Sequence, residues 1–330
     1  MISGSPDSQQ GQTRDQHPSL NLGNVSSLPA VGFISPSAWL DPAPYEFTTV
    51  IQEPVLTQQA IPLLPDFDFS FESLTSEVLA EQLCLCARTL QAAGCSVVVQ
   101  VGNPFAWANV TSEAEAWRRN ERIASATNLP TIMTTLAIVE ALRAHQANRI
   151  AITTTFYSQT WNKRFTDFME LCGFNIIHAS NFYQQGLVKQ INPEDEEEHF
   201  RYTDLDNPVE AMANLIKASV QSVKEKAPDC EAIAIVGTGA RTLDILRSLE
   251  VIAQCPVVPA DTSVYWWAAR QLNLTLLPTI GRFRDLSLSC DLVSNPTQHD
   301  PIIYLSFKIK LIRNVCDIMR EFLCLTYLGE

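Results

Sequence analysis

Short apolar runs alternate with longer helical stretches along the chain from residue 74 to residue 272. Runs such as Arg149–Thr153 are rich in β-branched and aliphatic residues, whereas the segments between them have the apolar spacing and length of helices. A chain that returns through a helix after each strand builds parallel sheets, and strands without a polar face are covered on both sides. The alternation therefore predicts an α/β fold. The predicted strands are residues 95–101, 130–134, 149–153, 174–179, 232–236 and 256–258.

The order of elements around Gly102 is repeated around Gly237. In each place a buried strand ends at a glycine turn, and a helix, a short strand and an apolar helix follow. Two such halves predict two pseudo-symmetric lobes, each a short parallel sheet flanked by helices, with a cleft between them. A simpler explanation stays open, because strand–glycine–helix units occur in any α/β chain.

The composition argues against several classes of protein. The chain carries 23 basic and 36 acidic residues, a net charge of −13, whereas a nucleic-acid partner requires clustered lysine and arginine. No apolar stretch reaches the roughly 18 uninterrupted residues of a membrane span. The nine cysteines lack the spacing of a zinc site, and the first residues do not resemble a signal peptide. We therefore expect a cytoplasmic protein with reduced thiols and no metal.

The carboxyl ends of the parallel strands are the places where ligands bind in such sheets. The loops there contain few lysines or arginines and many glycine, hydroxyl and amide groups. Backbone N–H groups in such loops, and at the helix N-termini behind them, bind anions. The glycines have a second explanation, because each one also closes a tight turn. The predicted substrate-binding residues are Ser37, Gly102, Asn103, Tyr157, Gly237, Thr238 and Gly239.

The most distinctive stretch of the sequence is GTGARTLDILRSLEVIAQCPVVPADTSVYWWAARQLNL, residues 237–274. Earlier segments that accompany it are SVVVQVGNPFAW, ERIASATNLPTIMTTLAIVEALRA and NRIAITTTFYSQTWNKRF. Together they resemble the aspartate/glutamate racemase superfamily, and within it arylmalonate decarboxylase and the maleate cis-trans isomerases. The resemblance runs from about residue 31 to residue 283. It implies cofactor-independent chemistry on carbon acids next to a carboxylate, in an active site between two lobes.

The same resemblance divides the chain. It implies a first lobe of residues 31–147 plus a returning segment at about 263–283, and a second lobe of residues 148–262. Residues 1–30 are rich in serine, glutamine, glycine, asparagine and proline, and we expect a disordered tail there, with structure beginning at residue 30. Residues 284–330 lie outside the family fold. The alternatives for them are a partner-binding amphipathic helix or translated non-coding sequence.

The resemblance also implies catalytic cysteines at positions where this chain has none. The second-lobe position aligns with Gly237, and the first-lobe position with Gly102 or its neighbour. In the family, thiols move a proton or add to the substrate, while amide and hydroxyl donors hold carboxylate or enolate oxygens. All nine cysteines of this chain lie outside the strand-end loops. Other groups have to act if the protein is a catalyst.

Three residues are candidates for that catalysis. Asp261 follows a predicted strand and acts as an acid or base if burial raises its pKa; otherwise it caps the helix predicted to begin at Ser263. Tyr157 matches the substrate-binding tyrosine of the family, and it either donates to an enolate or packs at the seam between the lobes. His178 ends a strand and is either a cleft residue or an interior histidine. Arg241 is a carboxylate partner or points to solvent.

These observations predict decarboxylation or isomerisation (tautomerisation) of a small carboxylate through an enolate held between two lobes, without a cofactor. The alternative is a non-catalytic member that binds a carboxylate or serves as a scaffold after losing the catalytic thiols. The expected partner is a small carboxylate, not nucleic acid and not a membrane. The oligomeric state stays open, with a homo-oligomer as one alternative.

Overall fold

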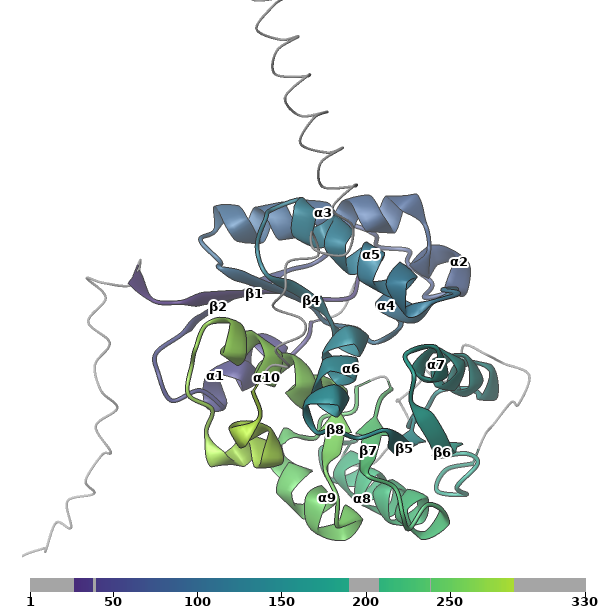
Figure 1. Ribbon diagram of the computed structural model, residues 1–330. Coiled ribbons are helices and arrows are strands. Elements are labelled where there is room, and N and C mark those ends of the chain that lie inside the picture. The colour runs from purple at the N-terminus through teal and green to yellow at the C-terminus, as the bar shows by residue number, and fades with distance from the viewer. Residues whose placement is uncertain (1–26, 38–39, 190–207, 238, 288–330) are drawn as a thin grey trace, which may run out of the picture.

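The computed structural model describes residues 27–37, 40–189, 208–237 and 239–287. They form two four-stranded parallel sheets, one in each lobe (Figure 1). The first sheet has the order β2-β1-β3-β4 and the second the order β6-β5-β7-β8, so the neighbours follow one pattern in both. The predicted α/β fold with two related lobes is confirmed. The strands are β1 (Ala30–Ile34), β2 (Leu56–Ala60), β3 (Val97–Gln100), β4 (Thr131–Met133), β5 (Arg149–Thr153), β6 (Asn175–Ser180), β7 (Ala232–Ile235) and β8 (Val257–Pro259).

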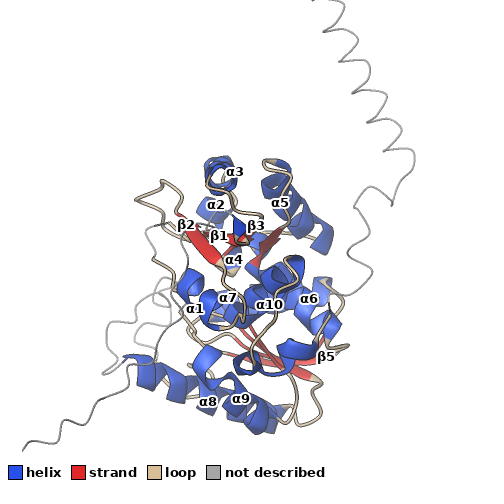
Figure 2. Ribbon diagram, turned by 90° about the vertical axis from the view of Figure 1, so that its left-hand side faces the viewer, coloured by secondary structure: helices blue, strands red, loops and turns tan. Residues whose placement is uncertain are grey.

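Helices cover both faces of each sheet, as the apolar strands require. In Figure 2, α3 and α5 lie above the first sheet, α8 and α9 lie below the second, and α1, α6 and α10 lie between the two sheets. The helices are α1 (Ala43–Thr49), α2 (Phe71–Leu74), α3 (Glu77–Ala92), α4 (Pro104–Trp107), α5 (Glu113–Ser125), α6 (Thr134–Ala144), α7 (Gln159–Leu171), α8 (Pro208–Lys226), α9 (Leu246–Ala253) and α10 (Ala260–Gln271). Two 3₁₀ segments are η3 (Leu243–Ile245) and η4 (Pro278–Asp285).

The helix α10 is buried on every side, because it packs against α6 and against strands of both sheets. Every residue from Asp261 to Ala269 is buried, including the aromatic rings of Tyr265 and Trp266. The sequence predicted that this helix would begin at Ser263, but it begins at Ala260. The error arises because the polar residues before Ser263 are typical of a loop, whereas here they lie inside the seam between the lobes.

Parts of the predicted domain organisation fall where the structure gives no description. Residues 1–26 of the predicted tail at 1–30 lie outside the described residues, and Ala30 already belongs to β1. Residues 288–330 of the predicted C-terminal segment also lie outside them. The lobe boundaries at 31–147 with about 263–283, and at 148–262, remain predictions. Within the described part of the chain, no helix combines the length and the apolar character that crossing a membrane requires.

A candidate active site between the lobes

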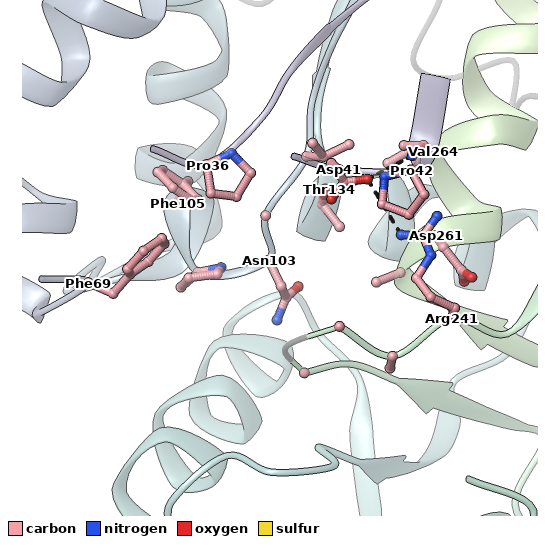
Figure 3. Close-up of a pocket in the computed structure, with 18 of the residues that line it drawn as sticks. Pro36, Asp41, Pro42, Phe69, Asn103, Phe105, Thr134, Arg241, Asp261 and Val264 are labelled. Atoms are coloured by element: carbon pink, nitrogen blue, oxygen red, sulfur yellow. Dashed lines mark hydrogen bonds and ion pairs between the residues drawn. The ribbon is translucent and has the colours of Figure 1, made fainter. Parts of the chain in front are cut away.

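A cavity of about 530 Å³ lies between the lobes, at the carboxyl ends of strands from both sheets. The first glycine turn, at Gly102 and Asn103 after β3, lines it, and so does the second, at Gly237 and Gly239 after β7. Residues of both turns line this one cavity, and Figure 3 shows the Asn103 side chain in it. Parallel strands bring their carboxyl ends to one edge of a sheet, which is why residues far apart in the sequence meet here.

Asn103 connects the two lobes through Tyr157. The Asn103 amide donates from Nδ2 to the Tyr157 phenol oxygen at 3.0 Å, and it accepts at Oδ1 from the Thr135 hydroxyl at 2.7 Å. The Tyr157 oxygen accepts in this bond, so its own O–H proton remains a donor. Tyr157 is only 2% exposed, and burial raises the pKa of its phenol. The ring therefore stays neutral and able to donate at physiological pH.

Both glycine turns have backbone conformations that exclude a side chain. Gly102 has φ +113° and Gly237 has φ +126°, in the region that favours glycine. A Cβ atom on Gly237 would lie 1.8 Å from the Thr155 hydroxyl oxygen and 2.6 Å from the Thr154 carbonyl oxygen. A Cβ atom on Gly102 would lie 2.6 Å from the Phe105 ring. A cysteine at either position would require the turn to rearrange.

Asp261 lines the cavity and fixes the loop that follows the second glycine turn. Its carboxylate accepts hydrogen bonds from the Thr242 backbone N–H and hydroxyl, both at 2.7 Å, and from the Thr262 N–H at 2.9 Å. Burial raises its pKa, while the nearby Arg241 opposes this shift. Asp261 lies in the first turn of α10, whose N-cap is Pro259, so it does not cap a helix beginning at Ser263.

Arg241 does not point to solvent, one of the two alternatives that the sequence left open. Its guanidinium binds both carboxylate oxygens of Glu46 and donates to the Tyr265 hydroxyl at 2.6 Å. The Asp41 carboxylate lies 3.6 Å from the same guanidinium, and burial raises the pKa of Asp41 (Figure 3). Arg241 is thus already neutralised by carboxylates of the first lobe. Sequence reasoning missed Glu46 and Asp41, because 195 residues separate Glu46 from Arg241.

The cavity has a charged end, where Asp41, Arg241 and Asp261 lie, and an apolar end. Figure 3 shows Pro36, Phe69 and Phe105 on one side of Asn103 and Asp41, Arg241 and Asp261 on the other. Thr134 and Ala260, which begin α6 and α10, also line it. The first-turn N–H groups of a helix lack intrahelical partners, so both helices present donors and a partial positive charge to a ligand.

Two predicted site residues are not brought to the cavity. The hydroxyl of Ser37 donates instead to the carbonyl oxygens of Pro62 and Leu64, although its neighbour Pro36 lines the cavity. The His178 ring lies on β6 with Nε2 3.0 Å from the Ser180 hydroxyl, and burial lowers its pKa. A third predicted residue, Thr238, lies outside the described residues.

None of the cysteines within the described ranges lines the cavity. They are Cys84, Cys86, Cys95, Cys172, Cys230 and Cys255, and all six are free. The same part of the chain contains no group of three or more histidine, cysteine, aspartate or glutamate residues placed to hold a metal ion. Within the described residues, the glycine turns therefore present the Asn103 amide and backbone atoms to the cavity.

The two facing lobes, with glycine turns at one cavity, are the architecture that the resemblance to the aspartate/glutamate racemase superfamily implied. The family model described as arylmalonate decarboxylase matches residues 70–283. The chain belongs to the arylmalonate decarboxylase family. No match was found among curated protein sequences.

Solved structures of this superfamily share the fold. Unliganded arylmalonate decarboxylase matches with a TM-score of 0.61 at 23% identity, covering 78% of this chain and 99% of that chain. Maleate isomerase from Pseudomonas putida S16 matches with a TM-score of 0.58 at 16% identity, covering 78% of this chain and 98% of that chain. A third match is a cysteine-to-serine variant of Nocardia farcinica maleate cis-trans isomerase with a covalently bound succinylcysteine intermediate. Its TM-score is 0.58 at 18% identity, and the match covers 79% of this chain and 100% of that chain.

Proposed function

We propose that this protein is a cofactor-independent decarboxylase or isomerase that forms an enolate of a small carboxylate without a catalytic thiol. The observation that carries this proposal is that both glycine turns and the Asn103–Tyr157 pair face one cavity. Membership of a family that includes decarboxylases supports carbon-acid chemistry. The apolar end, at Phe69 and Phe105, would receive a hydrocarbon substituent of the substrate.

The enolate would be stabilised by preorganised donors. When a malonate-type or β-keto acid loses carbon dioxide, the electron pair of the broken bond moves into the neighbouring carbonyl. Donors aimed at this developing negative charge lower the barrier most where water is excluded. The Tyr157 O–H, the Gly239 N–H and the first turn of α6 at Thr134 are the groups we assign to this task.

Asp261 is the group that we propose to return a proton to carbon. It lines the cavity, and burial raises its pKa, so a larger fraction is protonated near neutral pH than for an exposed aspartate. Its hydrogen bonds to Thr242 hold the carboxyl group in one position. His178 has no part in this mechanism, because it is not among the residues that line the cavity.

The lack of a cavity-lining cysteine among the described residues favours decarboxylation, which needs no base, and tautomerisation, which needs one, over racemisation. Loss of carbon dioxide itself generates the carbanion, so no base has to remove a proton from carbon. Racemisation requires two opposed bases, and both glycine turns exclude the side chains that would supply them.

Incubation of the purified protein with malonate-type, maleate-type and β-keto acid substrates tests the proposal. Carbon dioxide release or tautomerisation, with solvent deuterium incorporated at carbon, or geometric isomerisation of the maleate-type substrate, is the expected result. The second candidate function is a carboxylate-binding member without activity, and the lack of a cavity-lining cysteine within the described residues favours it. Carboxylate binding by calorimetry with no turnover of any class would establish that alternative and contradict ours.

A further inference from the structure

Two cysteines that the proposed mechanism does not use lie in contact at the opposite edge of the second sheet. Cys230 precedes β7 and Cys255 precedes β8, and their sulfur atoms are 3.9 Å apart. Both are nearly buried, with exposed fractions of 5% and 6%. The cavity lies at the carboxyl ends of these strands, whereas the two thiols lie before the amino ends, so the pair is separate from the candidate active site.

The sheet register holds the two cysteines together. The strands β7 and β8 are parallel neighbours, and the Ile233 N–H donates to the Pro256 carbonyl at 3.0 Å, within three residues of each cysteine. Cys230 also donates its backbone N–H to the Ala227 carbonyl oxygen at the end of α8. Both cysteines therefore directly precede neighbouring strands, with their sulfur atoms in contact.

The first lobe provides an internal comparison. There the Val98 N–H donates to the Pro130 carbonyl at 2.9 Å, the counterpart of the Ile233 bond. Counting back by the same number of residues, Cys95 corresponds to Cys230, and Leu129 corresponds to Cys255. Cys95 is 5% exposed, like Cys230, but the residue at the position corresponding to Cys255 is a leucine. Among the described residues, the second lobe has the paired thiol and the first lobe lacks it at the corresponding position.

The electrostatic surroundings distinguish Cys230 from the other buried cysteines. A thiol hydrogen bond joins its sulfur to that of Cys255, and the Lys224 ammonium lies 4.0 Å away. With Cys255 as the donor, this hydrogen bond lowers the pKa of Cys230 and the Lys224 ammonium lowers it further, against burial and the Asp229 carboxylate, which act the other way. The pKa of Cys255 is raised, because its proton is held by Cys230. Burial raises the pKa of the isolated Cys95 thiol.

We infer that Cys230 and Cys255 form a redox-active dithiol that a small disulfide of the glutathione class oxidises to an intramolecular disulfide. The Cys230 thiolate attacks one sulfur of the oxidant, whose S–S bond breaks and releases one thiolate that takes up a proton. Cys255 then loses its proton to solvent and attacks the Cys230 sulfur, releasing the second small thiolate, which is protonated. Two protein thiols are oxidised, and one small disulfide is reduced to two thiols.

The test treats the full-length protein with oxidised glutathione, blocks the remaining thiols by alkylation after unfolding, and maps the peptides by mass spectrometry. We expect a peptide that links Cys230 to Cys255 and two fewer alkylated thiols, while Cys95 remains fully alkylated. Absence of this link under conditions that oxidise a reference dithiol would overturn the inference. So would equal oxidation of Cys95.

Replacing Cys255 by leucine, the residue at the corresponding position of the first lobe, separates the attack by Cys230 from the resolution by Cys255. In Cys255→Leu, the attacking thiolate is present but the resolving thiol is missing, so a stable mixed disulfide of Cys230 with glutathione should accumulate and only one thiol should be lost. In Cys230→Ser, treatment with oxidised glutathione should remove neither thiol of the pair from alkylation, because the attacking thiolate is missing and Cys255 stays reduced. If Cys255→Leu does not fold, Cys255→Ser gives the same readout. A cross-linked or unmodified Cys230 in a folded Cys255 variant contradicts the mechanism.

Discussion

Replacing Gly237 by alanine tests whether the backbone conformation and the neighbouring atoms of the second glycine turn exclude a side chain. The backbone there has φ +126°, and the new Cβ atom would lie 1.8 Å from the Thr155 hydroxyl oxygen. An alanine in a left-handed backbone costs about 1–2 kcal/mol, and overpacking a filled site costs a further 1–3 kcal/mol or so. Gly237→Ala should therefore lower the free energy of unfolding by about 2–5 kcal/mol, measured by urea titration with circular dichroism.

A matched control separates the backbone contribution from the steric one. Gly94 has φ +90°, and a Cβ atom there would meet no atom within 4 Å. Gly94→Ala should lose only the backbone contribution of about 1–2 kcal/mol. Adding Thr155→Ala to the Gly237 variant removes the closest clashing atom and should recover about 1 kcal/mol as a coupling energy. Equal costs at Gly94 and Gly237, with no coupling to Thr155, would refute the reasoning.

The structure predicts the change in stability for three further substitutions. Glu140 is buried with an unpaired oxygen, and burial raises its pKa from 4.5 to about 7. Ionising it costs stability as pH rises through this range, so Glu140→Gln should be more stable than wild type by about 3 kcal/mol above pH 7 and equal below pH 4. Asp261→Asn should lower the free energy of unfolding by about 1–3 kcal/mol, because the new amide N–H group would face a donor of Thr242. An unchanged urea midpoint would contradict this prediction. Arg241→Gln leaves the Glu46 carboxylate without its cation and should lower the free energy of unfolding by about 3 kcal/mol at pH 7. An unchanged urea midpoint for this variant would contradict the assignment of the ion pair.

The sequence predicted those parts of the fold that depend on regular apolar patterns. The strand β5 has the predicted bounds, and β1 begins at the predicted residue, because both are continuous buried runs. The strand β2 was missed, since LTQQA has no apolar alternation and lies at the edge of the first sheet. The seven-residue helix α1 was missed because it is too short to show a helical period.

The candidate site was predictable only where it follows the strand ends. Gly102, Asn103, Tyr157, Gly237 and Asp261 directly or closely follow strands, so the rule for parallel sheets places them together. The residues that position them depend on tertiary contacts instead. A threonine of α6, a glutamate far away in the sequence and a half-buried aspartate gave no local signal. These are Thr135, Glu46 and Asp41.

The most direct test of thiol-free enolate formation is the rate at which the protein incorporates solvent deuterium at the carbon next to a substrate carboxylate, followed by proton NMR. The rate should be measurable for at least one of the three substrate classes and unchanged after the accessible cysteines are alkylated. It should fall about 100-fold in Tyr157→Phe, which removes one enolate donor. Incorporation that alkylation abolishes, or that no substrate class shows, would contradict the account.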